Sequence, residues 1–299
     1  MSKPRRHHFV PVSYLNGFVE DEEGFLNIYS KSTGRWLRRK PKKVMIRKEY
    51  YRQYWVPDGI DKNILEKKLG AELEPKGLGA LRKLIDVPDS LDEDDTVNIL
   101  NYLAFQRIRV PRQVGMAKAL VQIAITQEVK KTPEGREALK HVKVVIKDSV
   151  FRIEFMRTVL GALTPFFIRM IWEVIEVQAG LSFITSDSPV SYYNVDFPPP
   201  TEPGPAHYGT TVFFPINKRF LLVMRHPEYE SGQKEASETL PKYLDVEDGV
   251  IEVQRGIVWD KEKVQRQNLL MLQLSQDLVV GESKAILERT VGKALAGHR

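Results

Sequence analysis

The sequence predicts an α+β fold in which a helical middle region is flanked by an N-terminal hairpin and a C-terminal antiparallel β-sheet. Residues 1–57 alternate polar and apolar positions around turn residues, residues 61–172 carry apolar residues at helical spacing, and residues 173–299 return to alternation before closing helices. We expect the N-terminal hairpin to pack against the C-terminal sheet. Residues 1–299 are therefore predicted to form a single interleaved domain.

The first predicted strands form a β-hairpin. Residues 25–29 alternate apolar and polar side chains, residues 31–34 supply Lys-Ser-Thr-Gly turn chemistry, and residues 35–38 return. An acidic turn that ends at Gly24 precedes this hairpin, and a run of basic residues follows it. Opposite charges therefore border the two strands.

The helical region opens with a helix predicted over residues 61–86. Four apolar residues that begin at Ile64 fall at i, i+1, i+5 and i+9, which makes one apolar stripe. Pro75 is expected to break or kink this helix, because proline lacks an N–H and its ring clashes with the preceding turn. Ser90 or Asp92 can cap the next helix, whose first turn is acidic, as the helix dipole favours.

Prolines mark the later helix boundaries. Pro111 is expected to end or kink the second helix, and another helix is predicted over residues 113–131. Thr132 and Pro133 then combine a cap with proline at the first helical position, which predicts a new helix. Pro165 is expected to mark the boundary after the last helix of the region.

The C-terminal region is predicted to be rich in strands. Residues 173–177 and 181–185 alternate on either side of a turn at Gly180, which is typical of a hairpin. Asp260 is a cap for a helix that reaches Gln276. The other predicted strands cover residues 190–193, 211–215, 220–224 and 278–280, and a helix closes the chain.

Composition excludes several classes of site. The chain has no cysteine, which removes disulfides, thiolate zinc sites and a cysteine nucleophile. It shows no apolar run of about 18 residues and no secretory-type leader, so we expect a cytoplasmic protein without a membrane partner. Walker, dinucleotide-binding, zinc-protease and nucleophile-elbow motifs are absent, which argues against the common nucleotide-binding and hydrolase classes.

Positive charge is concentrated in the first sixth of the chain. Residues 1–52 contain 13 Lys and Arg against 5 Asp and Glu, although the whole chain carries only +6. Such a field attracts polyanions and speeds their encounter. We therefore expect nucleic acid or another polyanion to bind here, with Arg38 and Lys42 among the contacts. The alternative is that the charge serves solubility.

His8 is the first candidate catalytic residue. Imidazole serves as acid, base, metal ligand or phosphate contact near neutral pH. Apolar and aromatic neighbours predict that this end of the chain is docked into the body, where a histidine can line a pocket. The alternative is a buried histidine that holds the N-terminus through a backbone carbonyl. His7 is expected to face solvent or to contact a substrate or partner.

Asp187 is the second candidate, as a catalytic residue and as a metal ligand. It lies in a Thr-Ser-Asp-Ser-Pro segment after a predicted strand, and ends of strands often carry function. Four oxygen-bearing side chains there can bind a hard cation or orient water. The alternative is a local turn made by hydrogen bonds between side chains and backbone before Pro189.

Gln106, Arg109 and Arg112 form the third candidate, for substrate binding. Gln106 and Arg109 are three residues apart on a predicted helix and share a face, and Arg112 follows three residues later, beyond Pro111. One such face can clamp a carboxylate or a phosphate. The alternative is that these cations pair with acids of neighbouring helices.

Glu66 and Glu74 are candidate metal ligands. They lie about two helical turns apart and roughly share a face. Together with His8 and Asp187 they would make a cluster able to hold Mg²⁺ or Mn²⁺. Asn268 is expected to add an amide contact to a substrate, and the alternative is a helix-surface or capping role.

The segment His-Phe-Val-Pro-Val-Ser-Tyr-Leu-Asn-Gly-Phe that begins at His8 resembles the opening of a bacterial family catalogued as domain of unknown function 4238. That opening reads Gln-His-Tyr-Val-Pro-Gln-Phe-Tyr-Leu-Arg-Asn-Phe, so the family's Gln falls on His7 and its Tyr on Phe9. The resemblance spans nearly the whole chain and implies a single-domain protein, without an activity to carry over. It continues at residues 28–34, 103–112, 183–190 and 213–216, and at the helix around Asn268.

These observations lead to three functional hypotheses. The first is a metal-dependent phosphodiester hydrolase or nuclease with a stress or phage-defence role. In it, His8 is the general base or a ligand, Asp187 a metal ligand and Arg109 a phosphate clamp. The second is a non-catalytic module that binds nucleic acid or an acidic partner through residues 31–52. The third is a structural or oligomerising protein, and the sequence does not indicate its oligomeric state.

Overall fold

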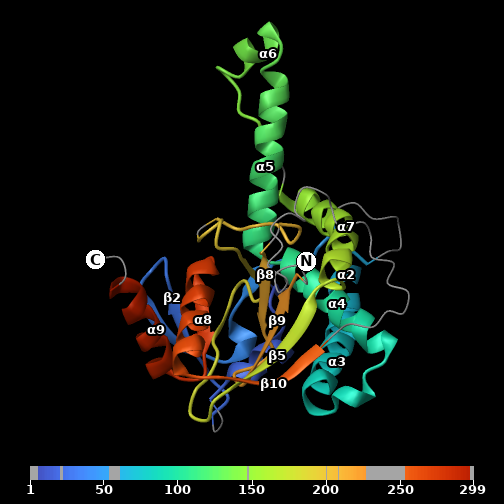
Figure 1. Ribbon diagram of the computed structural model, residues 1–299. Coiled ribbons are helices and arrows are strands. Elements are labelled where there is room, and N and C mark those ends of the chain that lie inside the picture. Colours follow the sequence, from blue (N-terminus) through green and yellow to red (C-terminus); the bar gives the residue numbers. More distant parts are fainter. Residues whose placement is uncertain are drawn as a thin grey trace.

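A five-stranded sheet, a four-stranded sheet, a two-stranded ribbon, a helical region, one projecting helix and two C-terminal helices make up the described part of the chain in its computed structural model (Figure 1). This architecture confirms the predicted α+β fold. The structure describes residues 6–20, 23–53, 61–146, 148–199, 201–207, 209–226 and 253–296.

The larger sheet has five strands in the order β10-β5-β9-β8-β7. Strand β10 runs parallel to β5, and the other neighbouring strands are antiparallel. Four of these five strands are predicted from the sequence and are confirmed with small shifts of their ends, whereas β10 is not predicted. The strands are β5 (Ile171–Val177), β7 (Ser191–Tyr193), β8 (Thr211–Pro215), β9 (Phe220–Arg225) and β10 (Val253–Trp259).

The smaller sheet joins the two ends of the chain. Its antiparallel order is β3-β2-β11-β6. Strands β2 (Leu26–Ser30) and β3 (Arg35–Arg39) form the predicted N-terminal hairpin, and β2 is hydrogen-bonded to β11 (Leu278–Gly281). The short β6 (Thr185–Ser186) lies on the other side of β11. Segments about 250 residues apart in sequence therefore share one sheet.

The hairpin predicted over residues 173–185 is wrong. Its first half is β5, but both edges of β5 are already paired, with β9 and β10. The chain instead crosses after Gly180 to the smaller sheet, and the Phe183 N–H donates to the Lys218 carbonyl at 2.9 Å. The neighbouring residues Phe183 and Ile184 are buried in two different apolar clusters, and this accounts for the strand-like sequence pattern of the segment.

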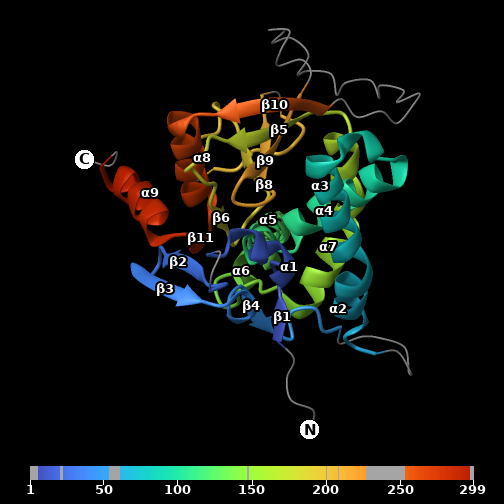
Figure 2. The same cartoon turned by 90° about the horizontal axis from the view of Figure 1, so that it is seen from below.

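The N-terminal segment is docked into the body, as its apolar residues predict. Strand β1 (Arg6–His8) pairs with β4 (Ile46–Lys48) in a two-stranded ribbon (Figure 2). Helix α1 (Val12–Leu15) then places the Tyr14 hydroxyl 2.7 Å from the Thr185 hydroxyl and 2.7 Å from the Pro215 carbonyl. Because β6 and β8 belong to different sheets, this one buried side chain ties both sheets to the start of the chain. The short turns η1 (Asn16–Phe18) and η2 (Pro41–Lys43) flank this region.

Of the predicted break or kink at Pro75, the break is wrong: the helical segment is continuous there, although it changes type just before this residue. Helix α2 (Ile64–Lys68) passes through a π-helical segment, η3 (Leu69–Leu73), into α3 (Glu74–Asp86). Pro75 is the second residue of α3 and directly follows the π-helical segment, so the α-helical hydrogen-bond pattern is interrupted just before it. After η4 (Pro88–Ser90), α4 (Glu93–Ile108) begins with a capping box in which the Asp92 side chain accepts from the Asp95 N–H at 2.8 Å.

The remaining helices follow the predicted order. Helix α7 includes Pro165 near its end, so the predicted boundary falls two residues early. The side chains of the predicted caps Thr132 and Asp260 each accept a hydrogen bond from a backbone N–H. Helices α8 and α9 pack on the smaller sheet. The bounds are α5 (Pro111–Val129), α6 (Pro133–Ala138), α7 (Asp148–Phe167), α8 (Lys261–Leu274) and α9 (Lys284–Ala296).

Gly77 allows α3 and α4 to approach closely. A Cβ at Gly77 would lie 2.7 Å from Cγ of the buried Tyr102, whereas a Cβ at Gly79 of the same helix would meet nothing within 4 Å. We expect Gly77→Ala to lower the free energy of unfolding by about 1–3 kcal/mol, the usual range for overpacking. Gly79→Ala should raise it by up to about 1 kcal/mol, since alanine favours helix. Urea denaturation of both variants tests this, and equal effects would contradict it.

Candidate functional site

A groove of about 620 Å³ lies between the β1–β4 ribbon and the β2–β3 hairpin, which Figure 2 shows next to each other along one side of the molecule. We call it the cationic groove. Four exposed cations line it, from three strands and the η2 turn, and its lining contains no acid. The lining residues are Arg6, Arg39, Lys43 and Lys48, with Ile28, Leu37, Val44, Met45, Ile46 and Leu278.

No carboxylate of the described residues neutralises the cations of the groove. Within the ranges that the structure describes, none of the four makes an ion pair with a carboxylate. Moreover, Arg6 lies directly opposite Lys48 in the β1–β4 register. Like charges opposite each other in a ribbon repel, so this pairing costs stability unless an anion binds between them.

Backbone strain flanks the same strand. Met45 and Glu49, on either side of β4, have φ values of 53° and 52°. Side chains with a Cβ rarely adopt this left-handed region, and such residues cluster at functional sites, at a cost of about 1–3 kcal/mol each. The Met45 carbonyl accepts a bond from the Phe9 N–H at 3.1 Å, which holds one strained residue against the N-terminal segment.

A second polar assembly lies where β1 meets the helices. We call it the polar cluster; it consists of His8, Glu66, Glu74, Tyr102, Gln106 and Arg109. Its centre is the fully buried guanidinium of Arg109, which lies 2.9 Å from the Glu74 carboxylate. The Arg109 Nε donates to the Phe9 carbonyl at 2.8 Å, and the Gln106 amide donates to the same oxygen at 3.2 Å.

The π-helical segment explains how both carboxylates reach this place. In a regular helix the eight residues from Glu66 to Glu74 would rotate their side chains apart by about 80°. The η3 segment interrupts the α-helical period between them. Segments of this kind are rare and occur frequently at functional sites. Arg109 and Glu74 both act electrostatically on Glu66.

Burial in the polar cluster shifts the pKa of two groups, and in both it favours the uncharged form. Burial, opposed by Arg109 and reinforced by the charge of Glu74, raises the pKa of Glu66 to about 7. Burial also lowers the pKa of His8, against a hydrogen bond with the Lys42 backbone and the charge of Glu74. Among the described residues, His8 Nε2, the Tyr102 hydroxyl and Gln106 Oε1 are buried without a hydrogen-bond partner.

Asp187 does not belong to the polar cluster. Its carboxylate accepts three backbone N–H bonds of 2.8–3.0 Å, from Gln276, Asp277 and Leu278. Burial raises the pKa of Asp187, although these three bonds oppose the shift. Among the described residues, the partners of Asp187 lie at the start of β11 and those of His8 in the polar cluster and at the Lys42 backbone, so the predicted meeting of these two groups stays a prediction.

The predicted metal ligands are likewise not assembled. Glu66 neighbours Arg109 and Glu74, whereas Asp187 is bound to the backbone that leads into β11. Within the described part of the chain, no group of three or more His, Asp and Glu side chains is placed to hold a metal ion. The Mg²⁺ or Mn²⁺ site predicted from these residues has no gathered ligand set there.

His7 is not a solvent-facing contact. Its Nδ1 accepts the Tyr51 N–H at 2.8 Å, and its ring stacks on that of Tyr51 with centroids 5.7 Å apart. Asn268 has a similar internal role, because its amide bonds the Ser182 carbonyl and the Ile184 N–H, both at 3.0 Å. Both predictions of substrate contact are therefore replaced by structural roles.

The predicted arginine clamp is divided between two places. Arg109 points to the polar cluster, whereas Arg112 lies 3.3 Å from Glu202 and bonds the Leu274 carbonyl. The sequence reasoning missed Arg107, whose buried guanidinium also pairs with Glu202 and lies 3.9 Å from the centre of the Tyr192 ring. Only its place in the same helix could have drawn attention to it.

Arg38 and Lys42 lie near the cationic groove but do not line it. Arg38 pairs with Glu20 at 2.7 Å and Glu23 at 2.5 Å and covers the Phe25 ring. Lys42 is exposed, and its backbone holds His8. The basic region therefore contains both neutralised and open cations, and the groove is formed by the open ones.

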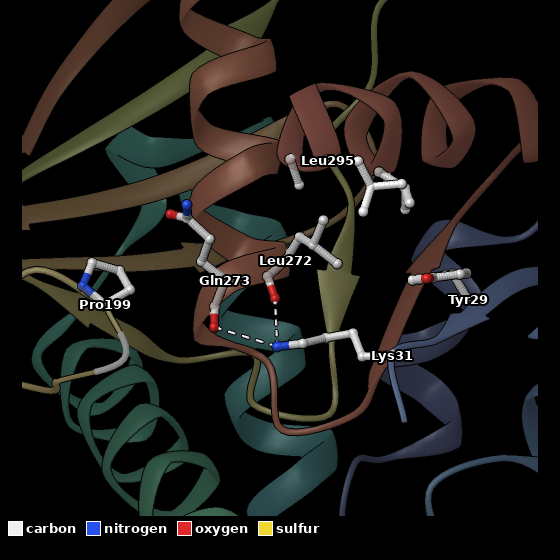
Figure 3. A pocket seen from close by; sticks show the side chains of 8 residues that line it. Tyr29, Lys31, Pro199, Leu272, Gln273 and Leu295 are labelled. Atoms are coloured by element: carbon white, nitrogen blue, oxygen red, sulfur yellow. Dashed lines mark hydrogen bonds between the residues drawn. The ribbon is translucent and has the colours of Figure 1, made fainter. Parts of the chain in front are cut away.

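A smaller pocket of about 350 Å³ lies between β2, the end of α8 and α9 (Figure 3). Lys31 donates from Nζ to the carbonyls of Leu272 at 3.0 Å, Gln273 at 3.4 Å and Ser275 at 2.8 Å. Burial lowers the pKa of Lys31. Since three carbonyls at the end of α8 occupy its donors, we interpret Lys31 as a cap of that helix.

Comparison with known proteins adds one match. A family model described as protein of unknown function (DUF4238) matches residues 6–285. No curated protein and no solved structure matches the chain. None of the helices in the described ranges combines the length and apolar character of a membrane span.

The raised pKa of Glu66 has a consequence for stability. Folded Glu66 holds its proton up to about pH 7, whereas its ordinary pKa is 4.5. Between these values the folded state binds more protons than the unfolded state, so rising pH costs stability. We expect Glu66→Gln to be increasingly more stable than the wild type as pH rises from about 4.5 to 7, with a constant difference above that. Exposed Glu72→Gln is the control, and parallel pH profiles of unfolding for all three proteins would contradict the assignment.

Proposed function

This chain belongs to the DUF4238 family of proteins of unknown function, and from that premise we propose that it binds nucleic acid through the cationic groove. The observation that carries the proposal is the set of four cations that line the groove without an acid among them. A phosphate backbone supplies regularly spaced charges to such a surface, and release of its counterions drives binding.

Three further features support this proposal. The opposed pair Arg6 and Lys48 is stabilised by an anion placed between its charges. The strained residues Met45 and Glu49 hold β4 in place at an energetic cost that a purely structural ribbon does not require. The apolar floor of the groove, which includes Ile28 and Leu37, offers a surface for bases or sugars below the cationic rim.

The hydrolase hypothesis rests on a different observation, the near-neutral titration in the polar cluster. A carboxyl group with a pKa of about 7 can act as a general acid, and a histidine with an unpartnered Nε2 can act as a base. Strand β1 carries both Arg6 of the groove and His8, so a bound strand lies near these groups. This second candidate is weaker, because Arg109 and Asp187 are already occupied by protein partners.

The binding proposal predicts a steep dependence on salt. Four phosphate contacts to a single strand correspond to a slope of log K against log salt of about −3. We expect the quadruple variant Arg6→Gln, Arg39→Gln, Lys43→Gln and Lys48→Gln to lose at least about tenfold in affinity and most of that slope. Fluorescence anisotropy with a labelled single-stranded oligonucleotide measures both quantities.

A matched control removes the same charge elsewhere. Lys68, Lys76, Lys261 and Lys263 are exposed, lie outside the groove and make no ion pair in the described residues. Their simultaneous change to Gln should leave most of the affinity intact. Equal losses in the two quadruple variants would mean that net charge alone drives binding, and binding of an acidic protein without binding of oligonucleotides would also reject the proposal.

The hydrolase candidate predicts cleavage that depends on the polar cluster. We expect the wild type to cleave labelled oligonucleotides, with His8→Ala and Glu66→Gln reducing the rate by about 10²-fold or more while binding is retained. The assay is run with Mg²⁺, with Mn²⁺ and with a chelator, which tests the proposed metal dependence directly. The same background rate for wild type and both variants in all three conditions removes this candidate.

A further inference from the structure

Helix α5 leaves the body of the protein and projects into solvent, with α6 at its far end (Figure 1). We call residues 111–146 the arm. Only Pro111 and Val114, in the first turn of α5, are buried. A helix without tertiary contacts gains little from propensity alone, and most helices in proteins are stabilised by packing an apolar face. The outer part of α5 lacks such packing within the described chain.

The arm exposes apolar side chains that a soluble helix normally buries. Residues 113–127 contain a single charged side chain, Lys118. Leu120 is 66% exposed and Ile123 is 52% exposed. Of the 13 large hydrophobic residues exposed in the described ranges, seven lie in the arm. They are Met116, Leu120, Val121, Ile123, Ile125, Val142 and Val145. A concentration of this kind marks an interaction surface.

The spacing of these residues defines the shape of the partner surface. Met116, Leu120 and Ile123 fall at i, i+4 and i+7, the pattern of a seam between two packed helices. Gln113 and Gln127 continue the seam at both ends and limit its apolar part to about two turns. The seam therefore fits a second helix with a similarly short apolar stripe.

We propose that this stripe pairs with the arm of a second copy of the chain, in antiparallel orientation about Leu120. The partner surface must be helical, apolar and almost uncharged, and the arm itself has these properties. Figure 1 shows a body much wider than the arm, so parallel arms side by side would bring the two bodies into collision. The antiparallel arrangement points the two bodies in opposite directions and sets Met116 of one copy against Ile123 of the other.

The size of the arm predicts a reversible dimer. From Gly115 to Val129 the helix is about 22 Å long at roughly 1.5 Å per residue and about 10 Å wide. Such a strip is smaller than the roughly 800 Å² that each partner contributes to a standard interface. Weak, reversible association is therefore expected. A membrane surface fits less well, because the tip of the arm carries charges of both signs, including Glu134, Arg136 and Glu137.

Sedimentation equilibrium of the full chain tests the proposal. The weight-average mass of the wild type should rise from 34.4 kDa toward twice that value as the concentration increases into the high micromolar range. Leu120→Glu with Ile123→Glu should remain monomeric, because ionised carboxylates would face each other in the seam. Both positions are exposed, so circular dichroism should show an unchanged fold. The matched control, Val87→Glu with Val195→Glu, changes two equally exposed valines outside the arm and should dimerise like the wild type.

The absence of cysteine allows the axis to be tested directly. Leu120→Cys should form a disulfide-linked dimer on mild oxidation, whereas Val195→Cys should not, because only residue 120 lies on the proposed two-fold axis. A wild type that remains monomeric at every concentration overturns the proposal, as does a dimer that the arm variant does not weaken. A dimer that Leu120→Cys fails to link overturns the antiparallel arrangement. Association with anionic vesicles in place of self-association would assign the arm to a membrane surface.

Discussion

The buried guanidinium of Arg109 is the interaction on which the arrangement of this protein depends. A charge with no exposed surface is tolerated only when it is paired and hydrogen-bonded. Here Glu74 supplies the opposite charge and the Phe9 carbonyl accepts one of the donors. These partners lie on α3 and just after β1, so the requirement of one side chain brings the start of the chain to the helical region. The close approach of α3 to α4 at Gly77 belongs to the same arrangement.

The N-terminal basic region divides into two populations once the chain is folded. Arg38 is neutralised by two glutamates, whereas Arg6, Arg39, Lys43 and Lys48 line the groove without a carboxylate partner in the described ranges. A count of charges along the sequence cannot separate these populations, because the separation depends on strand register. The register places Arg6 beside Lys48 and leaves both side chains exposed.

Local signals explain which parts of the fold could be predicted. The β2–β3 hairpin and the Asp260 cap of α8 depend on residues close together in sequence, and both are present. The parallel pairing of β10 with β5 and the crossing at Gly180 depend on which strand edges are already occupied, which the sequence does not show. Prediction of the candidate site was limited in the same way, because it also depends on contacts between distant parts of the chain. His8, Gln106 and Arg109 are gathered by β1 and α4, but Asp187 is taken up by backbone N–H groups that only the folded chain brings to it.

The alternation of β1 links the groove to the polar cluster. Arg6 and His8 lie on one face of the strand, and His7, on the other face, is anchored to the Tyr51 backbone. An anion bound as proposed between Arg6 and Lys48 would remove the repulsion across the ribbon and stabilise the strand that also positions His8. His8 in turn contacts the Lys42 backbone, next to Lys43 of the groove. The groove and the polar cluster therefore depend on the same two segments, residues 6–8 and 42–48.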